Sequence, residues 1–252
     1  TMESGKYPAR ASNITVKVDG KVVSGAATMS GSTLTVQTGA LAAGTHSVTI
    51  DVSDDAGNRT RVAATVTAGN AANVFADTDG HWARGYASQL YERDIMPGET
   101  GSDGKTYFNP DRNLTRKEFA VTIARLLGLD TSYTGETAFD DDASIPSWAR
   151  GAIYAVSEAG IMQGSSNGDK LYFDPDADMT RAEVMTVIGR CLPRGYAANP
   201  MTFSDAASVP SWALEQVKIC VSADIISGYN DNTLQPLGKI TRGEIAKILA
   251  LF

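Results

Sequence analysis

The first part of the chain alternates apolar and polar positions with a period of two, from about residue 14 to residue 67. The alternation is strict over residues 44–52, and Asp19-Gly20 is a hairpin turn signal between two shorter runs. Such alternation is typical of antiparallel strands that bury one face. The pattern predicts a small antiparallel β-sandwich of five or six short strands. The strands that it indicates lie at 14–18, 21–23, 34–37, 44–52 and 61–67.

A small, polar linker at 69–73 separates this region from one in which apolar positions recur at helical spacing. The helical stripe occurs three times, each time after a polar loop. Its members are Phe119, Ile123, Leu126 and Leu127; Val184, Val187, Ile188 and Cys191; and Ile245, Ile248 and Leu249. A first helix of about twelve residues, for example 82–93, precedes each loop. Each helix pair alone has few apolar residues to bury, so we expect the three to pack into one domain.

One phrase opens the second helix of every unit: threonine, arginine, a variable residue, glutamate. It stands at 115–118, 180–183 and 241–244, at intervals of roughly 60 to 65 residues. A threonine three residues before a glutamate is a capping box, in which each side chain binds the backbone N–H of the other residue. Helix capping therefore explains the threonine and the glutamate, but it does not explain the arginine.

The recurring arginines are Arg116, Arg181 and Arg242. At the first helical position a positive charge faces the positive end of the helix dipole, at a cost of a few tenths of a kcal/mol. A guanidinium beside free helix N–H groups is favourable where an anion binds, so we interpret the three arginines as an anion site. The alternative is a salt bridge to an acid of a neighbouring unit, which at a surface contributes at most about 1 kcal/mol.

Four short motifs recur in the same order in every unit. They are Phe-x-Asp at 75–77, 139–141 and 203–205, Trp-Ala at 82–83, 148–149 and 212–213, Ile-x-x-Gly at 95–98, 161–164 and 225–228, and the Thr-Arg-x-Glu phrase. This ordered set resembles the S-layer homology (SLH) domain in three tandem copies. The stretch from Gly44 onward, with its turn at 54–58, resembles the closing hairpin of bacterial immunoglobulin-like modules.

The resemblance implies a multidomain protein: a mainly α three-pronged spindle of pseudo-threefold helix–loop–helix units, after a small N-terminal antiparallel β-sandwich. We expect residues 1–10 to be a tail or a cut from a longer chain. The other expected parts are an immunoglobulin-like spacer at 11–68, a linker at 69–73 and an SLH domain at 74–252, with copies at about 74–130, 138–194 and 202–252.

The resemblance also implies a function. SLH domains anchor surface proteins non-covalently to secondary cell-wall polysaccharide, often pyruvylated, in grooves between copies. Their arginine contacts the pyruvate carboxylate, a role that carries over to Arg116, Arg181 and Arg242. The expected location is extracellular, at the bacterial cell surface or cell wall, as in an S-layer. Lys117 and Gly243 replace the family's alanine, and the third copy has a shorter loop. We therefore expect unequal grooves.

Further candidate carbohydrate-binding residues come from the other motifs. The tryptophans are core anchors or platforms for a sugar ring. The glycines end the first helix with a positive φ, or let the backbone approach a sugar. The acids brace the loop or contact the ligand. These candidates are Trp82, Trp148 and Trp212; Gly98, Gly164 and Gly228; and Asp77, Asp140 and Asp205.

The composition of the chain argues against several classes of function. The net charge of −7 and the pI near 4.9 argue against nucleic acid, and no apolar run suits membrane insertion. Cys191 and Cys220 read as buried thiols, and two distant histidines make a zinc site or a histidine-dependent nucleophile improbable. The acidic loops lack EF-hand spacing, so solvated acids are favoured over calcium. We expect no metal and no cofactor.

Two other function classes compete with carbohydrate binding. No acid/base pair of a glycosidase stands apart from the helix caps, so we expect no catalytic residues and no enzyme. In the stronger rival, the Thr-Arg-x-Glu faces of a structural module make protein–protein contacts in a surface lattice. A short pyruvylated oligosaccharide separates the two hypotheses, because it should bind a carbohydrate groove and leave a lattice contact unaffected.

Overall fold

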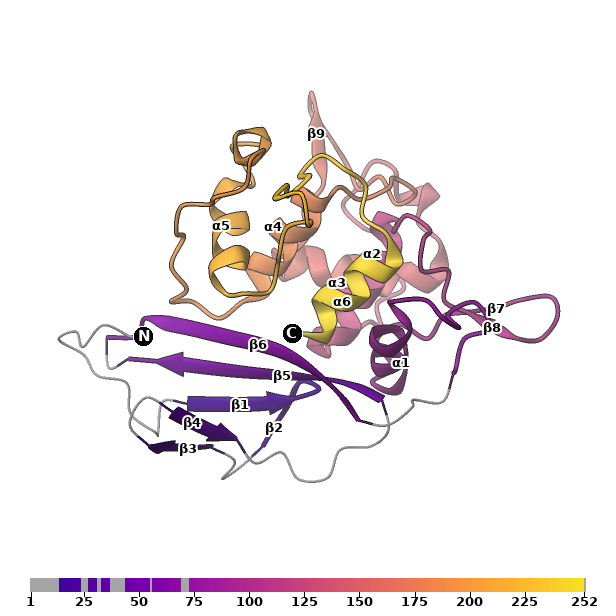
Figure 1. Cartoon of the computed structure of the whole chain (residues 1–252). Helices are drawn as coiled ribbons and strands as arrows, with labels where there is room; N and C mark the ends of the chain where they lie inside the picture. The colour runs from indigo at the N-terminus through magenta and orange to yellow at the C-terminus, as the bar shows by residue number, and fades with distance from the viewer. Residues whose placement is uncertain are drawn as a thin grey trace.

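The structure, a computed structural model, describes residues 14–23, 27–30, 33–36, 44–54, 56–68 and 73–251. Its N-terminal part is a four-stranded antiparallel sheet in the order β2-β1-β5-β6. The strands are β1 (Ile14–Val18), β2 (Lys21–Val22), β5 (Gly44–Ser53) and β6 (Arg59–Ala68). A separate hairpin pairs β3 (Ala27–Ser30) with β4 (Thr33–Val36). Figure 1 shows the sheet lying along one side of the helices.

All five predicted strands exist within two residues of their predicted bounds, and the described residues add β3, which the pattern missed. The β3 sequence, Ala-Thr-Met-Ser, has one large apolar residue and so gives no alternating signal. Strands β5 and β6 have ten residues each and pair without interruption from Gly44–Ala68 to Ser53–Arg59. They form the longest hairpin of the described chain, with β6 at the edge of the sheet.

Helices dominate the rest of the chain and come in three pairs. The first helices are α1 (Arg84–Glu92), α3 (Ser147–Glu158) and α5 (Leu214–Ser222), and the second are α2 (Arg116–Leu127), α4 (Arg181–Cys191) and α6 (Arg242–Ala250). Single 3-10 turns, η2 (Asp142–Ser144) and η3 (Ala206–Ser208), precede α3 and α5. Short hairpins fill the two longer loops: β7 (Glu99–Thr100) with β8 (Thr106–Tyr107), and β9 (Ser165–Asn167) with β10 (Lys170–Tyr172).

The second helices begin where the repeated phrase predicts. Capping boxes are present at Thr115, Thr180 and Thr241. The backbone N–H of each threonine donates to the glutamate three residues on, at 3.0, 2.7 and 2.9 Å. These bonds satisfy N-terminal donors that a helix leaves unpaired, so the start of each second helix is fixed locally.

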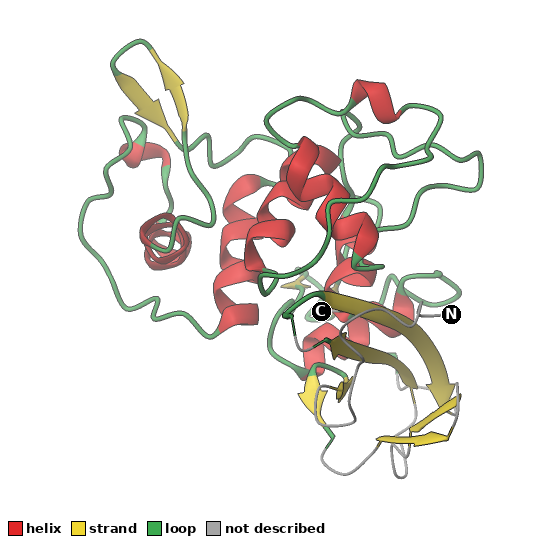
Figure 2. Ribbon diagram, turned by 90° about the vertical axis from the view of Figure 1, so that its left-hand side faces the viewer, coloured by secondary structure: helices red, strands yellow, loops and turns green. Residues whose placement is uncertain are grey.

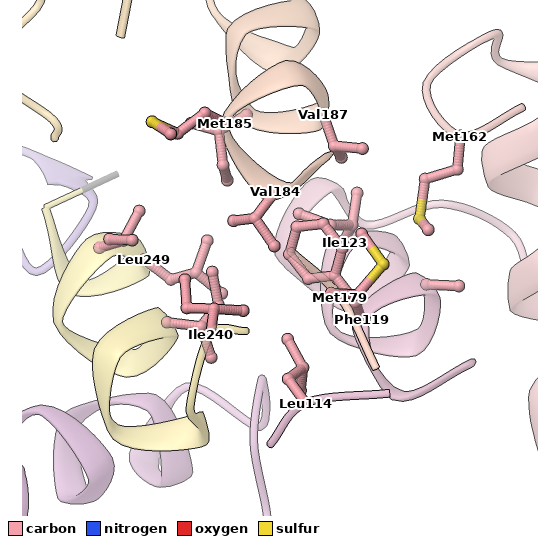
Figure 3. Close-up of a cluster of buried hydrophobic side chains, with 14 of the residues drawn as sticks. Leu114, Phe119, Ile123, Met162, Met179, Val184, Met185, Val187, Ile240 and Leu249 are labelled. Carbon is pink, nitrogen blue, oxygen red and sulfur yellow. The ribbon is translucent and has the colours of Figure 1, made fainter. Parts of the chain in front are cut away.

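The three units close into a ring around the residue that precedes each capping threonine. Leu114 donates its backbone N–H to Ile240, Ile240 to Met179, and Met179 to Leu114, with N···O distances of 3.0, 3.1 and 2.9 Å. All three side chains are buried, and Figure 3 shows them converging with Phe119 and Leu249. Each copy is therefore bonded to both others at the centre of the helical region.

The helices follow the same cyclic order. Helix α2 packs against α3, α4 against α5, and α6 against α1, so each second helix contacts the first helix of the next copy. The buried apolar side chains of all three copies form one continuous cluster, from Phe75 to Leu249. The expectation that the copies share a core is confirmed. Figure 1 shows the sheet on the side where α6 meets α1, and Figure 2 shows the strands gathered to one side of the helices.

Candidate functional site

Three grooves open between the copies, and each is lined by one arginine of the repeated phrase. We name them by that residue: the Arg181 groove of about 450 Å³, the Arg116 groove of about 240 Å³ and the Arg242 groove of about 260 Å³. Every groove combines an arginine from one copy, a glycine and a glutamate from the next, and a tryptophan from the third. The sets are Arg181, Gly228, Glu244 and Trp82; Arg116, Gly164, Glu183 and Trp212; and Arg242, Gly98, Glu118 and Trp148.

The arginines are held in one geometry. Each Nε donates to a backbone carbonyl oxygen of the next copy: Arg116 to Phe173 at 2.7 Å, Arg181 to Leu234 at 2.8 Å, and Arg242 to Phe108 at 2.7 Å. Each guanidinium also lies over an aromatic ring at 4.6–5.0 Å from its centroid. These contacts fix each arginine side chain in the lining of its groove.

The salt-bridge alternative is present in a loose form. The Nη1 atoms of Arg116, Arg181 and Arg242 lie 4.0, 3.7 and 3.6 Å from the glutamate of the next copy's phrase. A close charge-assisted hydrogen bond is about 2.7–2.9 Å long. The glutamates therefore lower the charge of the grooves without occupying the arginines.

The hypothesis that free helix N–H groups bind the anion is wrong. The N–H groups of Arg116 and Lys117 donate to Ala177 and Pro175, and the other two helices repeat this pair of bonds with a neighbouring loop. The glutamate of the capping box takes the threonine N–H. Since neighbouring copies use these donors for assembly, the guanidinium is left as the cationic group of each groove.

The tryptophans are exposed rather than anchored in the core. Trp82, Trp148 and Trp212 keep 53%, 58% and 60% of their surface accessible, the largest such fractions of any aromatic side chain in the described chain. They precede or open the first helices, one residue before an alanine that is fully buried. The alanine inserts into the core, and the indole next to it is directed to the rim of a groove.

One interpretation, that the three glycines end the first helices, is wrong. The left-handed residues at those ends are Asp94, Gly160 and Asp224. A Cβ at Gly98, Gly164 or Gly228 would instead lie 2.5–2.8 Å from a backbone carbonyl oxygen and 2.4–2.8 Å from a phenylalanine ring. These glycines therefore allow close packing at the wall of the groove.

The acids brace the loops. Asp77 accepts the backbone N–H groups of Phe108 and Asn109 at 2.9 and 2.6 Å, and Asp205 accepts those of Leu234 and Gln235 at 2.8 Å each. In the second copy the equivalent brace is Asp141, which bonds Phe173 and Asp174 at 2.8 Å. The predicted Asp140 instead accepts the N–H of Leu171. The third position of Phe-x-Asp would have identified Asp141.

These braces connect to the grooves. Asp77, Asp141 and Asp205 hold the loops whose carbonyl oxygens, at Phe108, Phe173 and Leu234, accept from the arginine Nε atoms. The acids thus position the arginines through one backbone residue. None of the three lines a groove.

The grooves differ in the groups around their shared residues. In the Arg242 groove, Arg112 binds Glu118 with two hydrogen bonds, of 2.7 and 3.1 Å, and also bonds Glu99. In the Arg181 groove the hydroxyl of Tyr229 donates to Glu244. In the Arg116 groove, Glu183 has neither partner, and the arginine Nη2 donates to the Gln163 carbonyl at 3.0 Å.

Burial and pairing shift several pKa values. Burial lowers the pKa of the Arg116 and Arg242 guanidinium groups, although nearby acids raise it in part. For Glu118 burial alone would raise the pKa, but hydrogen bonds from Arg112 and Thr115 outweigh it and leave the pKa below its usual value. Burial, followed by the bond to Glu244, raises the pKa of Tyr229 to about 12.

The other candidate chemistries find no site among the described residues. No group of three or more His, Cys, Asp or Glu side chains there could hold a metal ion. Cys191 and Cys220 are free thiols, and burial raises the pKa of each to about 12. No helix in the described ranges is both long enough and apolar enough to cross a bilayer.

Comparison with known proteins gives one family and a consistent set of relatives. The S-layer homology domain model matches residues 74–120, 138–185 and 202–246. "Cell surface glycoprotein 1" of Acetivibrio thermocellus is 33% identical over 174 residues, which are 61% of this chain and 7% of the relative. The "Cellulosome-anchoring protein" of that organism is 32% identical over 56% of this chain and 32% of its own length. "S-layer protein sap" of Bacillus anthracis is 27% identical over 71% of this chain and 21% of its own length.

Proposed function

Since the chain belongs to the S-layer homology domain family, we propose that it anchors a bacterial surface protein to the cell wall without covalent attachment. The family and its surface-layer relatives indicate a location at the cell surface or cell wall. We propose a secondary cell-wall polysaccharide as the ligand, with a pyruvate ketal as the group recognised. The activity of a longer parent protein is a separate matter, because the chain spans under a third of these relatives' length.

One observation supports this function best: each arginine shares a groove with an exposed tryptophan and a glycine wall, in three independent examples. A ketal carboxylate would bind the guanidinium, whose pairing with the adjacent glutamate is too long to compete with it. The indole would pack on the apolar face of the sugar, and the glutamate would accept from sugar hydroxyls. A net charge of −7 gives no general attraction for an anionic polymer, so this local arrangement carries recognition.

The remaining parts follow from the same proposal. Residues 74–252 form a three-pronged spindle, with copies at about 74–130, 138–194 and 202–252, that presents three grooves. Several grooves on one rigid domain add avidity on a repetitive polymer. Residues 11–68 form an immunoglobulin-like β-sandwich spacer joined by the linker at 69–73. The domain catalyses no reaction and uses no cofactor.

Co-sedimentation with purified cell walls tests the function. We expect the full chain to bind intact walls, and to lose binding once the non-peptidoglycan polymer is stripped. Alanine variants of Arg116, Arg181 and Arg242, singly and together, should reduce binding progressively. Arg150→Ala is the matched control, because Arg150 is a half-buried arginine that bonds Asp142 outside the grooves.

A thermal melt of each variant separates loss of fold from loss of binding. Binding that survives both stripping and the triple substitution would overturn the proposal and favour the lattice hypothesis. A short pyruvylated oligosaccharide that competes with the wall would argue against the lattice.

A further inference from the structure

The Arg181 groove has a wall that the repeats do not supply. Ala63, Ala64 and Thr65 of β6 line it, whereas residues of the SLH copies alone line the other two grooves. The Arg181 groove is also the largest, at about 450 Å³. Figure 1 shows β6 passing close to the C-terminal end of α6, and residues from both elements line this groove. The N-terminal sheet thus enlarges one of three otherwise similar sites.

Close packing between α1 and β5 holds the sheet at this position. A Cβ at Gly85, in the first turn of α1, would lie 2.0 Å from the Oγ1 atom of Thr45 on β5. Glycine inside a helix is unfavourable by about 1 kcal/mol relative to alanine, so the position needs a reason. The corresponding Gly151 of α3 has a different one, because a Cβ there would lie 1.9 Å from the backbone oxygen of Thr131.

Polar contacts fix the sheet at the α1 side. Gln89 of α1 donates its side-chain Nε2 to Asp19 at 2.7 Å and to Ser47 at 3.0 Å. Asp19 also accepts the backbone N–H of Ser47 and contacts His46 at 2.6 Å. The β1–β2 turn and β5 are therefore joined to α1 through one partly buried cluster.

A second set of contacts fixes the sheet near the start of β6. The backbone N–H of Arg59 donates to the Gly195 carbonyl at 2.9 Å. Arg61 binds Asp51 through two hydrogen bonds, of 2.7 and 3.0 Å, and the Tyr196 hydroxyl donates to the same carboxylate. Gly195 and Tyr196 lie between α4 and α5. We call the contacts among Asp51, Arg59, Arg61, Gly195 and Tyr196 the clasp. Residues 63–65 of β6 lie between the clasp and the contacts with α1.

The exposed wall suits neutral sugar residues. Strand β6 is an edge strand, and an edge presents unpaired backbone donors and acceptors at every second residue. The charged residues lining the Arg181 groove balance, with Arg181 and Lys247 opposite Asp224 and Glu244. A longer ligand would therefore gain affinity in this groove through contacts of its hydroxyl groups rather than through further charged groups.

Building on the proposed function, we propose that Ala63–Thr65 of β6 form an extension subsite for uncharged saccharide residues next to the pyruvylated one held by Arg181. The Arg181 groove then binds several consecutive residues of the polymer, while the Arg116 and Arg242 grooves each bind a single pyruvylated residue. The N-terminal sheet takes part in recognition instead of acting only as a spacer.

Each groove holds one of the three tryptophans of the chain, which makes the test specific to a groove. In the full chain, Trp148→Phe with Trp212→Phe leaves Trp82 as the reporter of the Arg181 groove, and the other two pairs of substitutions report the other grooves. Fluorescence is titrated with a methyl glycoside of one pyruvylated hexose, and with a tetrasaccharide that ends in the same residue. Ala64→Leu fills the wall, and Val62→Leu is the control on β6, because Val62 is exposed and lines no groove.

We expect the tetrasaccharide to bind the Arg181 groove about tenfold more tightly than the monosaccharide, the gain of one or two further hydrogen bonds. Ala64→Leu should reduce that gain to less than about twofold, Val62→Leu should keep it, and the other reporters should show little gain. A gain that Ala64→Leu leaves intact, or that all three grooves share, would overturn the subsite. No response of any reporter to the monosaccharide would instead overturn the pyruvate function.

Discussion

The Arg181 groove and the Arg116 groove share an arginine, a glutamate, a glycine and a tryptophan in one arrangement, yet their surroundings differ. The Arg181 groove has nearly twice the volume, with β6 as one wall and Tyr229 bonded to its glutamate. The Arg116 groove adds Arg190, so its lining carries two arginines and one glutamate. The repeat supplies the residues that the two grooves share, while non-repeated residues determine the volume of each groove and the charge of its lining.

Removing the clasp should have the largest effect and should make the two grooves alike. Asp51→Ala leaves the buried Arg61 without its carboxylate, and breaking a buried ion pair on one side costs about 3–5 kcal/mol. We expect about 3 kcal/mol less stability of the sheet in chemical denaturation, and a loss of the tetrasaccharide preference at Trp82 alone.

Asp79→Ala is the control for this substitution, because Asp79 is an exposed acid paired with Arg84 and lies outside the clasp. It should change stability by less than about 0.5 kcal/mol. An Asp51→Ala protein that keeps the tetrasaccharide preference would show that the wall does not depend on the clasp.

Acid should reproduce the effect of Asp51→Ala. Burial alone would raise the pKa of Asp51, but hydrogen bonds from Arg61 and Tyr196 outweigh it and hold the pKa below 3.8. The carboxylate thus contributes its full stability above pH 3.8 and loses it as the pH falls through the lowered value. The tetrasaccharide preference at Trp82 should be constant from about pH 8 to pH 5 and should disappear in stronger acid, relative to the other reporters.

Overfilling the helix contact should give the next largest effect. Gly85→Val places a branched side chain where Thr45 lies, and overpacking of this kind costs about 1–3 kcal/mol. Thr45→Ala should restore part of the loss, which a double-mutant cycle of denaturation midpoints measures as a coupling. Strictly additive effects of the two substitutions would contradict the packing described for this contact.

Tyr229→Phe tests the glutamate of the Arg181 groove. Without the tyrosine hydroxyl, Glu244 can move from 3.7 Å toward Arg181 and compete with a ligand carboxylate. We expect about threefold to tenfold weaker binding of the monosaccharide at the Trp82 reporter, in line with one lost hydrogen bond. The Arg116 groove has no equivalent tyrosine, so unchanged affinity at the Trp212 reporter serves as the internal control.

Salt should produce the smallest difference. Between 50 and 200 mM salt, affinity for the pyruvylated monosaccharide should fall by about twofold to threefold more in the Arg116 groove than in the Arg181 groove. The reason is the excess positive charge of the Arg116 lining. Replacing Arg190 by glutamine should abolish the difference. Equal salt dependence at the Trp212 and Trp82 reporters would contradict this electrostatic explanation.

Local rules account for the features that the sequence pattern predicted well. A capping box joins residues three positions apart, so the starts of α2, α4 and α6 could be placed from Thr115, Thr180 and Thr241 alone. Alternation located β1 and β5 for the same reason, since a strand pattern is legible within a few residues. The three arginines were identified because a cation at the first helical position contradicts a local preference.

Grooves between copies were expected, but which residues share a groove could not be predicted, because each groove joins residues from three copies. Trp82 belongs with Arg181, and no spacing in the chain shows that pairing. The same holds for the first N–H groups of α2, which the sequence left free and the neighbouring loop binds. Gly85 is a further example, because nothing in its local sequence shows that the missing Cβ leaves room for Thr45.

The ring formed by Leu114, Met179 and Ile240 also determines when the domain can be completed during synthesis. Its closing contacts join the first copy to the last, and Arg242 bonds Phe108 across 134 residues of chain. Helix α1 finds its partner α6 only after the third copy has been made. Contacts so distant in sequence form slowly, because a long loop must close first. All three grooves also include residues of the third copy, so none of them is complete before that copy has been made.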